Sequence, residues 1–243
     1  MLAANVAVAK ELKARELGGI FRIHPEPKAV DIEEFIQWAR EIGLGRTVGK
    51  LDGRERVNAF LGRIKERHDA EIITSMFLRT LNRAVYSSVP TLHYGLGKED
   101  YCHFTSPIRR YPDLLVHQQL WAADRGDKPR SVEECTQKAV NCTTQEKNID
   151  EASFAAMDRL KIRYIQELRM RGERLIYEGI VLRRTGEGLQ IFLPDLGLFS
   201  ILPKKAIPKK ESGKVWKSGH LVYVKVHKAN PVRGQLLVAP AGA

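Results

Sequence analysis

Apolar residues recur every three or four positions through most of the N-terminal two thirds of the chain, which predicts a largely helical region. A first helix is predicted over residues 1–17, where four apolar residues share one helical face: Leu2, Val6, Ala9 and Leu12. Residues 20–24, Ile-Phe-Arg-Ile-His, then predict a short strand, which Pro25 and Pro27 close. The chain is thus expected to open with a helix and a strand.

Further helices are expected after this strand. Asp31 is placed to cap a helix that runs to Ile42, and glycines follow its last turn. Residues 53–66 and 69–86 show helical spacing and predict two more helices. A strand is expected at residues 91–94.

The next part of the chain predicts two more helices, of which the second is long. One begins near Pro112 and is expected to stop near Gly126. The other covers residues 131–170. Its apolar positions recur every four residues, as in a buried stripe: Ala152, Ala156, Leu160, Tyr164 and Leu168.

At Gly172 the apolar period changes from helical to alternating. Five alternating segments follow, separated by turn residues: 177–183, 189–193, 198–202, 221–226 and 235–238. Five strands in about 70 residues fit a small oligonucleotide-binding barrel. We therefore predict an α+β chain, with a helix-rich domain at residues 1–171 and a five-stranded OB-fold barrel at residues 172–243.

Charge points to a polyanionic partner, because the net charge is +11. The predicted barrel is the most basic part, with 12 Lys and Arg against 5 Asp and Glu. Six lysines gather in one loop: Lys204, Lys205, Lys209, Lys210, Lys214 and Lys217. Four aromatic residues could stack on bases: Phe192, Phe199, Trp216 and Tyr223. A lysine-rich loop that only keeps the protein in solution is the alternative.

Several classes of protein are not indicated by the sequence. It has no apolar run of 18 residues that would predict a membrane span, and charges from Lys10 onward interrupt any signal-peptide core. Three cysteines, Cys102, Cys135 and Cys142, are too few and too unevenly spaced for a disulfide framework. The spacing of Cys and His does not suggest a zinc site. A reducing, cytoplasmic setting is expected.

The candidate chemistry is concentrated in residues 93–117. Two helix starts fit this stretch: Thr105-Ser106-Pro107, with a hydroxyl cap and a proline in the first turn, and Pro112. In either case Arg109 and Arg110 fall in a turn or a first helical turn, where unpaired backbone N–H groups favour anions. A guanidinium beside such donors can clamp a phosphate. An ordinary capped helix with two surface arginines is the alternative.

Residues 93–96 are His-Tyr-Gly-Leu, and residues 105–114 are Thr-Ser-Pro-Ile-Arg-Arg-Tyr-Pro-Asp-Leu. This arrangement resembles the catalytic-domain motif of the ribonuclease II/ribonuclease R family of 3′→5′ exoribonucleases. Met1-Leu2-Ala3-Ala4-Asn5 and Arg22-Ile23-His24 resemble two further segments of that domain. The resemblance implies the C-terminal part of an RNB-type catalytic domain followed by an S1-like RNA-binding barrel. It is looser in the barrel, where the usual Gly-Phe-Phe-Val run appears as Gly188-Leu189-Gln190-Ile191.

The resemblance also implies roles for individual residues. Arg109 matches the arginine that approaches the scissile phosphate, and is the expected catalytic residue. The expected RNA contacts combine residues of the motif, one helix residue and residues of the barrel: Arg110, His103, Tyr111, Glu151, Lys204, Lys205, Lys209, Lys210, Phe192 and Trp216. For Glu151 the alternative is a solvated helix charge. His24 is a candidate catalytic base. The alternative is a structural histidine at the end of a strand, before a proline turn.

In the family, Mg²⁺ assists hydrolysis of single-stranded RNA to nucleoside monophosphates, and a cluster of aspartates in the first half of the domain holds it. Here the aspartates of the first half of the sequence are isolated: Asp31, Asp52, Asp69, Asp100 and Asp113. We identify no Mg²⁺ ligand in this chain, so the chain alone is expected to be inactive. It resembles a fragment, a truncated product or half of a split protein.

Two functions remain open at this point, and both have single-stranded RNA as partner and no membrane. The first is part of an exoribonuclease whose aspartates come from upstream sequence or from a separate chain. The second is a non-catalytic RNA-binding protein derived from the same family. A general basic protein that binds DNA is a third alternative.

Overall fold

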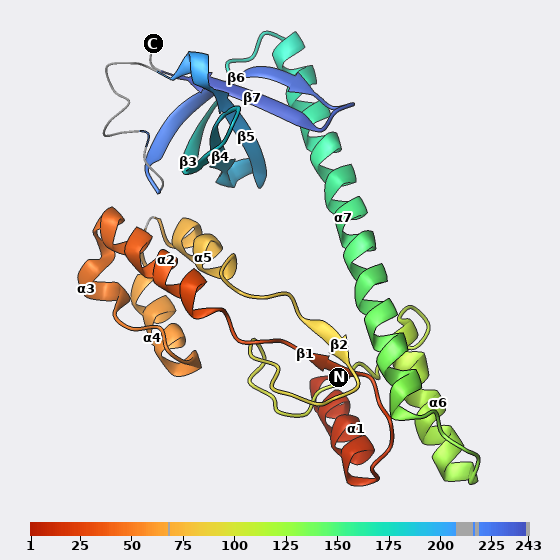
Figure 1. The fold of residues 1–243 in the computed structure, drawn as a ribbon. Coiled ribbons are helices and arrows are strands. Elements are labelled where there is room, and N and C mark those ends of the chain that lie inside the picture. The colour runs from red at the N-terminus through yellow and green to blue at the C-terminus, as the bar shows by residue number, and fades with distance from the viewer. Residues whose placement is uncertain (68, 208–215, 217–218, 242–243) are drawn as a thin grey trace. The chain divides into compact units, whose positions relative to one another are not determined.

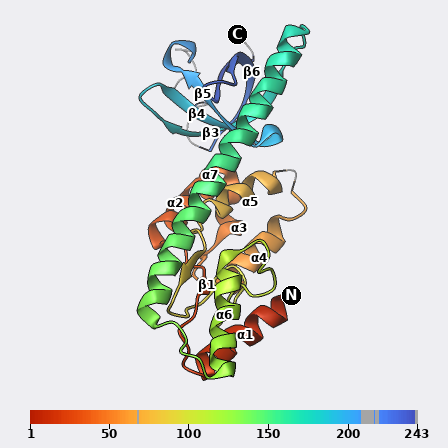
Figure 2. The ribbon, with the colours of Figure 1, turned by 90° about the vertical axis from the view of Figure 1, so that its right-hand side faces the viewer.

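The computed structural model describes residues 1–67, 69–207, 216 and 219–241 (Figure 1). The chain divides into two compact units, each assembled from separate stretches of sequence. Unit 1 comprises residues 1–33, 51–62 and 74–149, and unit 2 comprises residues 34–50, 63–73 and 150–243. Helix α7, Val132–Met170, contributes to both units and is unbroken in both ribbon views (Figure 2).

Unit 1 combines helices with one small sheet. Its elements are α1 (Leu2–Ala14), β1 (Phe21–Ile23), most of α4 (Arg54–Ile64), β2 (Val85–Ser87), α6 (Tyr111–Arg125) and the first part of α7. Strands β1 and β2 pair antiparallel, with Arg22 opposite Tyr86. A buried cluster fixes α1, β1 and α6 together: Ala9, Leu12, Phe21, Cys102 and Val116. A second cluster joins the sheet to α6 and α7: Ile20, Tyr86, Leu115, Ala139 and Cys142.

Helix α6 begins at Tyr111, so the second of the two predicted starts is correct. Pro112 lies in its first turn, where the missing N–H of proline costs no intrahelical hydrogen bond. Gly126 ends the helix, as predicted, and adopts a left-handed φ of 75°. Residues 105–110 therefore precede the helix as a turn.

Two predicted elements of this region are wrong. Helix α5 (Ala70–Leu78) ends well before residue 86, because residues 85–87 instead form β2 and pair with β1. The strand predicted at residues 91–94 is reduced to isolated bridges, in which His93 pairs with His24 and Lys98. Both errors involve pairing between segments far apart in sequence, which a local periodicity does not contain.

The helices before the barrel follow the predicted order. The helix predicted from Asp31 to Ile42 is present as α2 (Ala29–Ala39), and Asp31 lies inside its first turn. It continues into a π-helical turn, η1 (Arg40–Leu44), and then into α3 (Gly45–Val48). Gly43 adopts a φ of 87° inside η1, which favours glycine at this position.

The barrel of unit 2 has five strands, as predicted, and is closed in the order β3-β4-β5-β7-β6. Its strands are β3 (Ile176–Arg184), β4 (Gly188–Leu193), β5 (Leu198–Pro203), β6 (Leu221–Asn230) and β7 (Gln235–Pro240). Short 3₁₀ turns follow β4 and β5: η2 (Pro194–Leu196) and η3 (Lys204–Ala206). All pairs are antiparallel except β5 and β7. Gly188 is required here, because a Cβ would lie 2.0 Å from the carbonyl oxygen of Leu202.

Two isoleucines of α7 complete the barrel core. Ile162 and Ile165 are each 1% exposed and pack with the inward-facing residues of the strands. The stripe predicted to be buried on this helix is not: Leu160 and Tyr164 are 61% and 60% exposed. The four-residue period identified an apolar face correctly, but the barrel packs on a different face of the helix. None of the helices within the described residues has the length and apolar character needed to cross a membrane.

Candidate nucleic-acid interface

The turn that carries the two arginines is held by a buried carboxylate. The backbone N–H groups of Arg109 and Arg110 both donate to the carbonyl of Ser106, at 3.3 and 3.1 Å. Asp113 is fully buried, and its Oδ1 accepts from the Ser106 N–H at 2.8 Å and from Arg110 Nη2 at 2.7 Å. A buried carboxylate needs such donors, so the turn and the start of α6 are fixed together.

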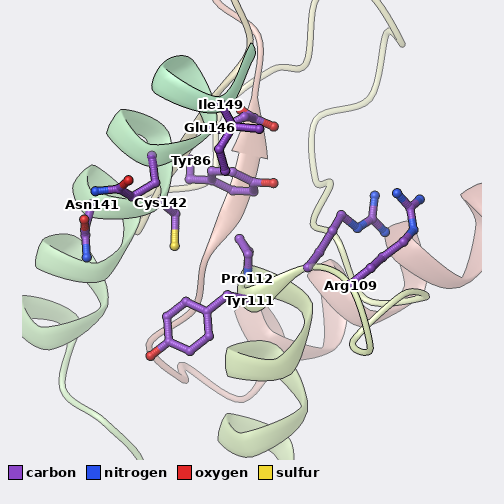
Figure 3. Close-up of a pocket in the computed structure, with 10 residues that line it drawn as sticks. Tyr86, Arg109, Tyr111, Pro112, Asn141, Cys142, Glu146 and Ile149 are labelled. Atoms are coloured by element: carbon purple, nitrogen blue, oxygen red, sulfur yellow. The ribbon is translucent and has the colours of Figure 1, made fainter. Parts of the chain in front are cut away.

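This arrangement separates the roles of the two arginines. Arg110 is bound to Asp113, and only 23% of its side chain is exposed. Arg109 is exposed, and its side chain makes no hydrogen bond or ion pair with any of the described residues. In Figure 3 the Arg109 side chain points away from α7. Arg109 is therefore available to an external anion, whereas Arg110 holds the turn.

A pocket of about 370 Å³ lies between this turn and α7 (Figure 3). It is lined by the turn and the α6 start, by β2 and by one side of α7: Tyr86, Arg109, Arg110, Tyr111, Pro112, Asn141, Cys142, Gln145, Glu146 and Ile149. The wall is mainly apolar and aromatic, and its charged groups are the two arginines and the carboxylate of Glu146, which is paired with Arg22. Pockets of this size and lining accept small organic ligands of nucleotide dimensions.

Two of the expected RNA contacts lie at this site in different environments. Tyr111 is 51% exposed, and its hydroxyl is 3.4 Å from Lys138 Nζ. An aromatic ring and a cation therefore lie next to one another at this site. His103 is partly buried, and its Nδ1 lies 3.0 Å from the Tyr86 hydroxyl. Tyr111 thus faces solvent, whereas His103 belongs to an internal network.

That network keeps neutral groups beside charged ones. Burial raises the pKa of Tyr86 to about 12. Burial, together with the positive charges of Arg110 and Arg22, lowers the pKa of His103 to about 4. The Cζ atom of Arg22 lies 4.5 Å from the centroid of the Tyr86 ring, and its Nη1 lies 2.5 Å from Oε2 of Glu146. At neutral pH His103 is therefore an uncharged hydrogen-bonding partner of the tyrosine.

The sequence did not identify Arg22, Tyr86 or Glu146 as part of this site. The helix predicted at residues 69–86 includes Tyr86, so its partners in β1 and α7 cannot be recognised from the sequence. Arg22 enters the sequence analysis only as part of the Arg-Ile-His segment. The alternation of that short strand was the one available signal that Arg22 and Ile23 point to opposite faces.

His24 is held by the backbone on both sides. Its Nε2 lies 2.7 Å from the carbonyl of Asn82, and its Nδ1 accepts from the Gly95 N–H at 3.1 Å. A Cβ on Gly95 would lie 2.9 Å from Nδ1, so the glycine permits this approach. The neighbouring His93 has a pKa lowered to about 4 by burial and by His24. The geometry favours a role for His24 in fixing the loop after residue 93.

The barrel presents a second group of candidates, described within unit 2. Phe192 and Phe199 lie 5.2 Å apart between ring centroids, and Phe199 is 43% exposed. Tyr223 is 65% exposed on β6. Trp216 is only 5% exposed and packs in the barrel core, so its ring has little free surface for stacking on a base.

The remaining candidates differ in what the structure describes of them. Lys204 and Lys205 are exposed in η3. The other four lysines of the predicted basic loop lie outside the described residues: Lys209, Lys210, Lys214 and Lys217. Glu151 is exposed on α7 and is not among the residues that line the pocket. The structure therefore brings Arg109, Arg110 and Tyr111 together at one pocket, with His103 behind them.

The described residues do not fit a magnesium site. Among them, no group of three or more His, Cys, Asp or Glu side chains is close enough together to hold a metal ion. Asp113, the most buried carboxylate near the arginines, is already bound to Arg110 and to the backbone. No catalytic step is therefore assigned here to a metal held by these residues.

Comparison with known proteins adds to this geometry. The family model described as the RNB domain matches residues 1–126, just over half of the 243 residues. The chain belongs to the RNB-domain family. This RNB-family chain is also 32% identical to Ribonuclease R 1 of Lactococcus lactis, in a match that covers 97% of this chain and 31% of that protein. It thus spans about a third of the length of this relative.

Solved structures share the fold over almost the whole chain. The apo form of Mycoplasma genitalium RNase R matches with a TM-score of 0.84 at 23% identity, over 99% of this chain and 40% of that one. Yeast Ssd1, described as a pseudonuclease, matches with a TM-score of 0.68 at 20% identity, over 93% of this chain and 28% of that one. The same architecture is therefore found in a ribonuclease and in a pseudonuclease.

Proposed function

We propose that this RNB-family chain is the RNA-binding and catalytic-scaffold portion of a cytoplasmic 3′→5′ exoribonuclease that hydrolyses single-stranded RNA to nucleoside monophosphates. One observation carries the proposal: a turn fixed by Asp113 presents the exposed, unpaired Arg109 beside a nucleotide-sized pocket. Solved structures of Mycoplasma genitalium RNase R support RNA as the ligand, because they contain ribose-methylated single-stranded RNA or double-stranded RNA.

The chemistry proposed for Arg109 is electrostatic. In-line attack on a phosphodiester places additional negative charge on the phosphate oxygens, and a fixed guanidinium stabilises that charge more in the transition state than in the ground state. Arg110 and Asp113 hold the turn, so the Arg109 backbone needs no rearrangement as the charge develops. Mg²⁺ would supply the nucleophilic hydroxide and charge neutralisation, held by carboxylates from upstream sequence or another chain.

The other assignments complete this proposal. Tyr111 contacts the RNA at the pocket, and Glu151 contacts it from α7. The residues 172–243 act as an S1-like RNA-binding domain, which is separated at Gly172 from the catalytic portion at residues 1–171. On the barrel, Phe192, Lys204 and Lys205 are the proposed contacts. Phe192 is partly buried beside the exposed Phe199, and both lysines are exposed, so an aromatic pair and two cations are present for stacking and phosphate binding.

A non-catalytic RNA-binding protein is the second candidate. The observation that favours it is the lack, among the described residues, of a carboxylate group able to hold a metal. The pseudonuclease Ssd1 has a similar fold, so the architecture is compatible with loss of activity. An Asp-rich segment encoded in frame upstream, or in a neighbouring gene, would favour the exoribonuclease instead.

The proposed function can be tested by RNA binding. We expect the chain to bind a fluorescent single-stranded RNA with a log–log salt slope of about −0.7 per phosphate contact. Removing residues 172–243 should weaken binding and reduce the slope. Replacing Arg125, which is exposed at the end of α6 and pairs with Asp127, provides a matched control that should change neither. Equal binding of DNA, with unchanged affinity after truncation, would instead favour a general basic protein.

A further inference from the structure

Helix α1 buries a polar side chain on its apolar face. Asn5 is only 4% exposed and shares this face with Ala9 and Leu12, which belong to the cluster that joins α1, β1 and α6. A buried amide costs free energy unless its polar atoms are hydrogen-bonded, and an apolar residue would pack here without that cost. The presence of an amide at this position therefore has to be explained by the hydrogen bonds that it makes.

The hydrogen bonds of Asn5 all reach the segment that leads into the arginine turn. Its Nδ2 donates to the Tyr101 hydroxyl at 3.1 Å, and its Oδ1 accepts from the Phe104 N–H at 3.2 Å. The backbone carbonyl of Asn5 also accepts from Sγ of Cys102 at 3.4 Å. One residue of α1 thus binds three positions of the segment 101–104.

Phe104 is held a second time, from helix α6. Nε2 of His117 lies 2.9 Å from the carbonyl oxygen of Phe104, and the two rings stack with centroids 4.1 Å apart and planes 9° apart. A carbonyl oxygen can only accept, so Nε2 carries the proton of this hydrogen bond. Both backbone polar groups of Phe104 are therefore bound, the N–H to Asn5 and the carbonyl to His117.

Phe104 directly precedes the turn that presents Arg109. Asp113 holds the interior and the end of this turn, through the N–H of Ser106 and the side chain of Arg110. The hydrogen bonds from α1 and α6 to Phe104 hold its start. A turn attached at one end only can pivot, and a misplacement of about 1 Å at a reacting group can lower a rate about 10²-fold.

We propose that Asn5 and His117 are positioning residues for Arg109. By fixing Phe104 they place the turn so that the guanidinium meets the scissile phosphate, and they act through the turn rather than on the RNA. This inference rests on the proposed function. It adds to that function the two side chains that hold the catalytic arginine from the start of its turn.

The first test measures amide hydrogen exchange of the full chain by NMR. Asn5→Ala should accelerate exchange of the Arg109 and Arg110 amides about tenfold, after correction for the free energy of unfolding in urea, because the turn opens locally. Gln119→Ala is the matched control. Gln119 is also a buried amide of unit 1, 2% exposed, but its hydrogen bonds reach backbone groups outside the turn. After the same correction it should leave exchange at the two arginines unchanged.

The second test couples Asn5 to Arg109 in a fusion of this chain with the part of Lactococcus lactis Ribonuclease R 1 outside its match. Asn5→Ala should lower the single-turnover rate about tenfold with little change in RNA affinity, and should cost little more once Arg109 is alanine. His117→Phe keeps a stacked ring but removes the donor, so it should show the same coupling and provides a second variant if Asn5→Ala does not fold. Gln119→Ala should combine additively with Arg109→Ala.

Three results would overturn the inference: unchanged exchange at the two arginines in Asn5→Ala, equal acceleration in Gln119→Ala, and additive losses of rate with Arg109→Ala. The unmodified fusion distinguishes this failure from failure of the proposed function. If the unmodified fusion releases mononucleotides from single-stranded RNA while the variants give one of these results, only the positioning role is wrong. If it releases none, the proposed function is wrong and the positioning role falls with it.

Discussion

At the scale of single residues, the two adjacent arginines differ, because only Arg110 has a side-chain partner among the described residues. Arg110 is bound to the buried Asp113, whereas Arg109 is exposed and unpaired within the described residues. The sequence predicted that both lie before or at a helix start, and that Arg110 contacts RNA. It did not predict the pairing of Arg110 with Asp113, because the local sequence does not show that the turn brings Ser106 and Arg110 to the same carboxylate.

Replacing Arg109 is expected to affect turnover more than RNA affinity. In an enzyme completed with the aspartate-bearing part, Arg109→Ala should reduce turnover by roughly 10²–10³, because a donor to the transition-state phosphate is lost. Arg109→Lys should recover only part of it, since an ammonium lacks the bidentate geometry. Arg110→Ala should have a milder effect on turnover. Single-turnover kinetics on bound RNA measure the turnover of each variant, and RNA titrations measure its affinity. Equal loss of affinity with turnover retained would make the arginines channel charges.

Histidine burial predicts a dependence of stability on pH. Burial lowers the pKa of both His103 and His93 to about 4, so the unfolded chain binds their protons at a higher pH than the folded chain. The contribution of these histidines to the free energy of unfolding should therefore be constant above about pH 6.5 and fall as the pH decreases toward 4. The steepest slope is about 1.4 kcal/mol per pH unit for each histidine. Urea unfolding between pH 7.5 and 5.5 tests this. His103→Gln, which does not titrate, should show a shallower dependence; an identical dependence would contradict the assignment.

At the scale of elements, the structure shows which features local sequence determines. The barrel strands and the ends of α6 were predicted to within a few residues, because turn residues and prolines set them locally. Strand β2 was missed, because it exists only through pairing with β1. The apolar period of α7 was recognised, but periodicity does not state whether another segment covers the face. Local signals thus located the Arg109 turn but not the network behind it.

The turn before α6 should depend on its buried carboxylate. Asp113→Ala removes the acceptor of the Ser106 N–H and leaves Arg110 without its partner, which costs about 3–5 kcal/mol for a buried pair. Asp127→Ala removes the partner of Arg125 in an exposed pair, and should change stability by less than about 0.5 kcal/mol. The free energies of unfolding in urea give the comparison. Similar values for the two variants would show that Asp113 does not anchor the turn.

At the scale of the whole molecule, the question is whether these residues suffice for chemistry. The chain spans about a third of the length of Ribonuclease R 1 from Lactococcus lactis, and its described residues contain no metal-binding group. Fold and family could be recognised from one sequence motif and a change of period. Activity could not be recognised in the same way, because the proposed hydrolysis needs a group of metal-binding carboxylates and the aspartates in the first half of the sequence are isolated.

We expect the isolated chain to release no mononucleotides from single-stranded RNA in the presence of Mg²⁺. The proposed hydrolysis requires a metal held in place, and the part of the chain that the structure describes contains no carboxylate cluster for it. Chromatography of the products of an end-labelled RNA measures the release. An Arg109→Ala preparation made in parallel controls for contaminating nucleases. Robust release that this variant abolishes would mean that a metal site in the chain was overlooked.

The burial of the three cysteines has a practical consequence for experiments on unit 1. All three thiols are free and buried, and burial raises the pKa of Cys102 to about 12. A thiol reacts with alkylating reagents as the thiolate, so Cys102 should be labelled only when the packing of α1, β1 and α6 opens. All three cysteines belong to unit 1 and none to the barrel. The rate of alkylation, followed by mass spectrometry, would therefore time the opening of the arginine-bearing unit separately from unfolding of the barrel.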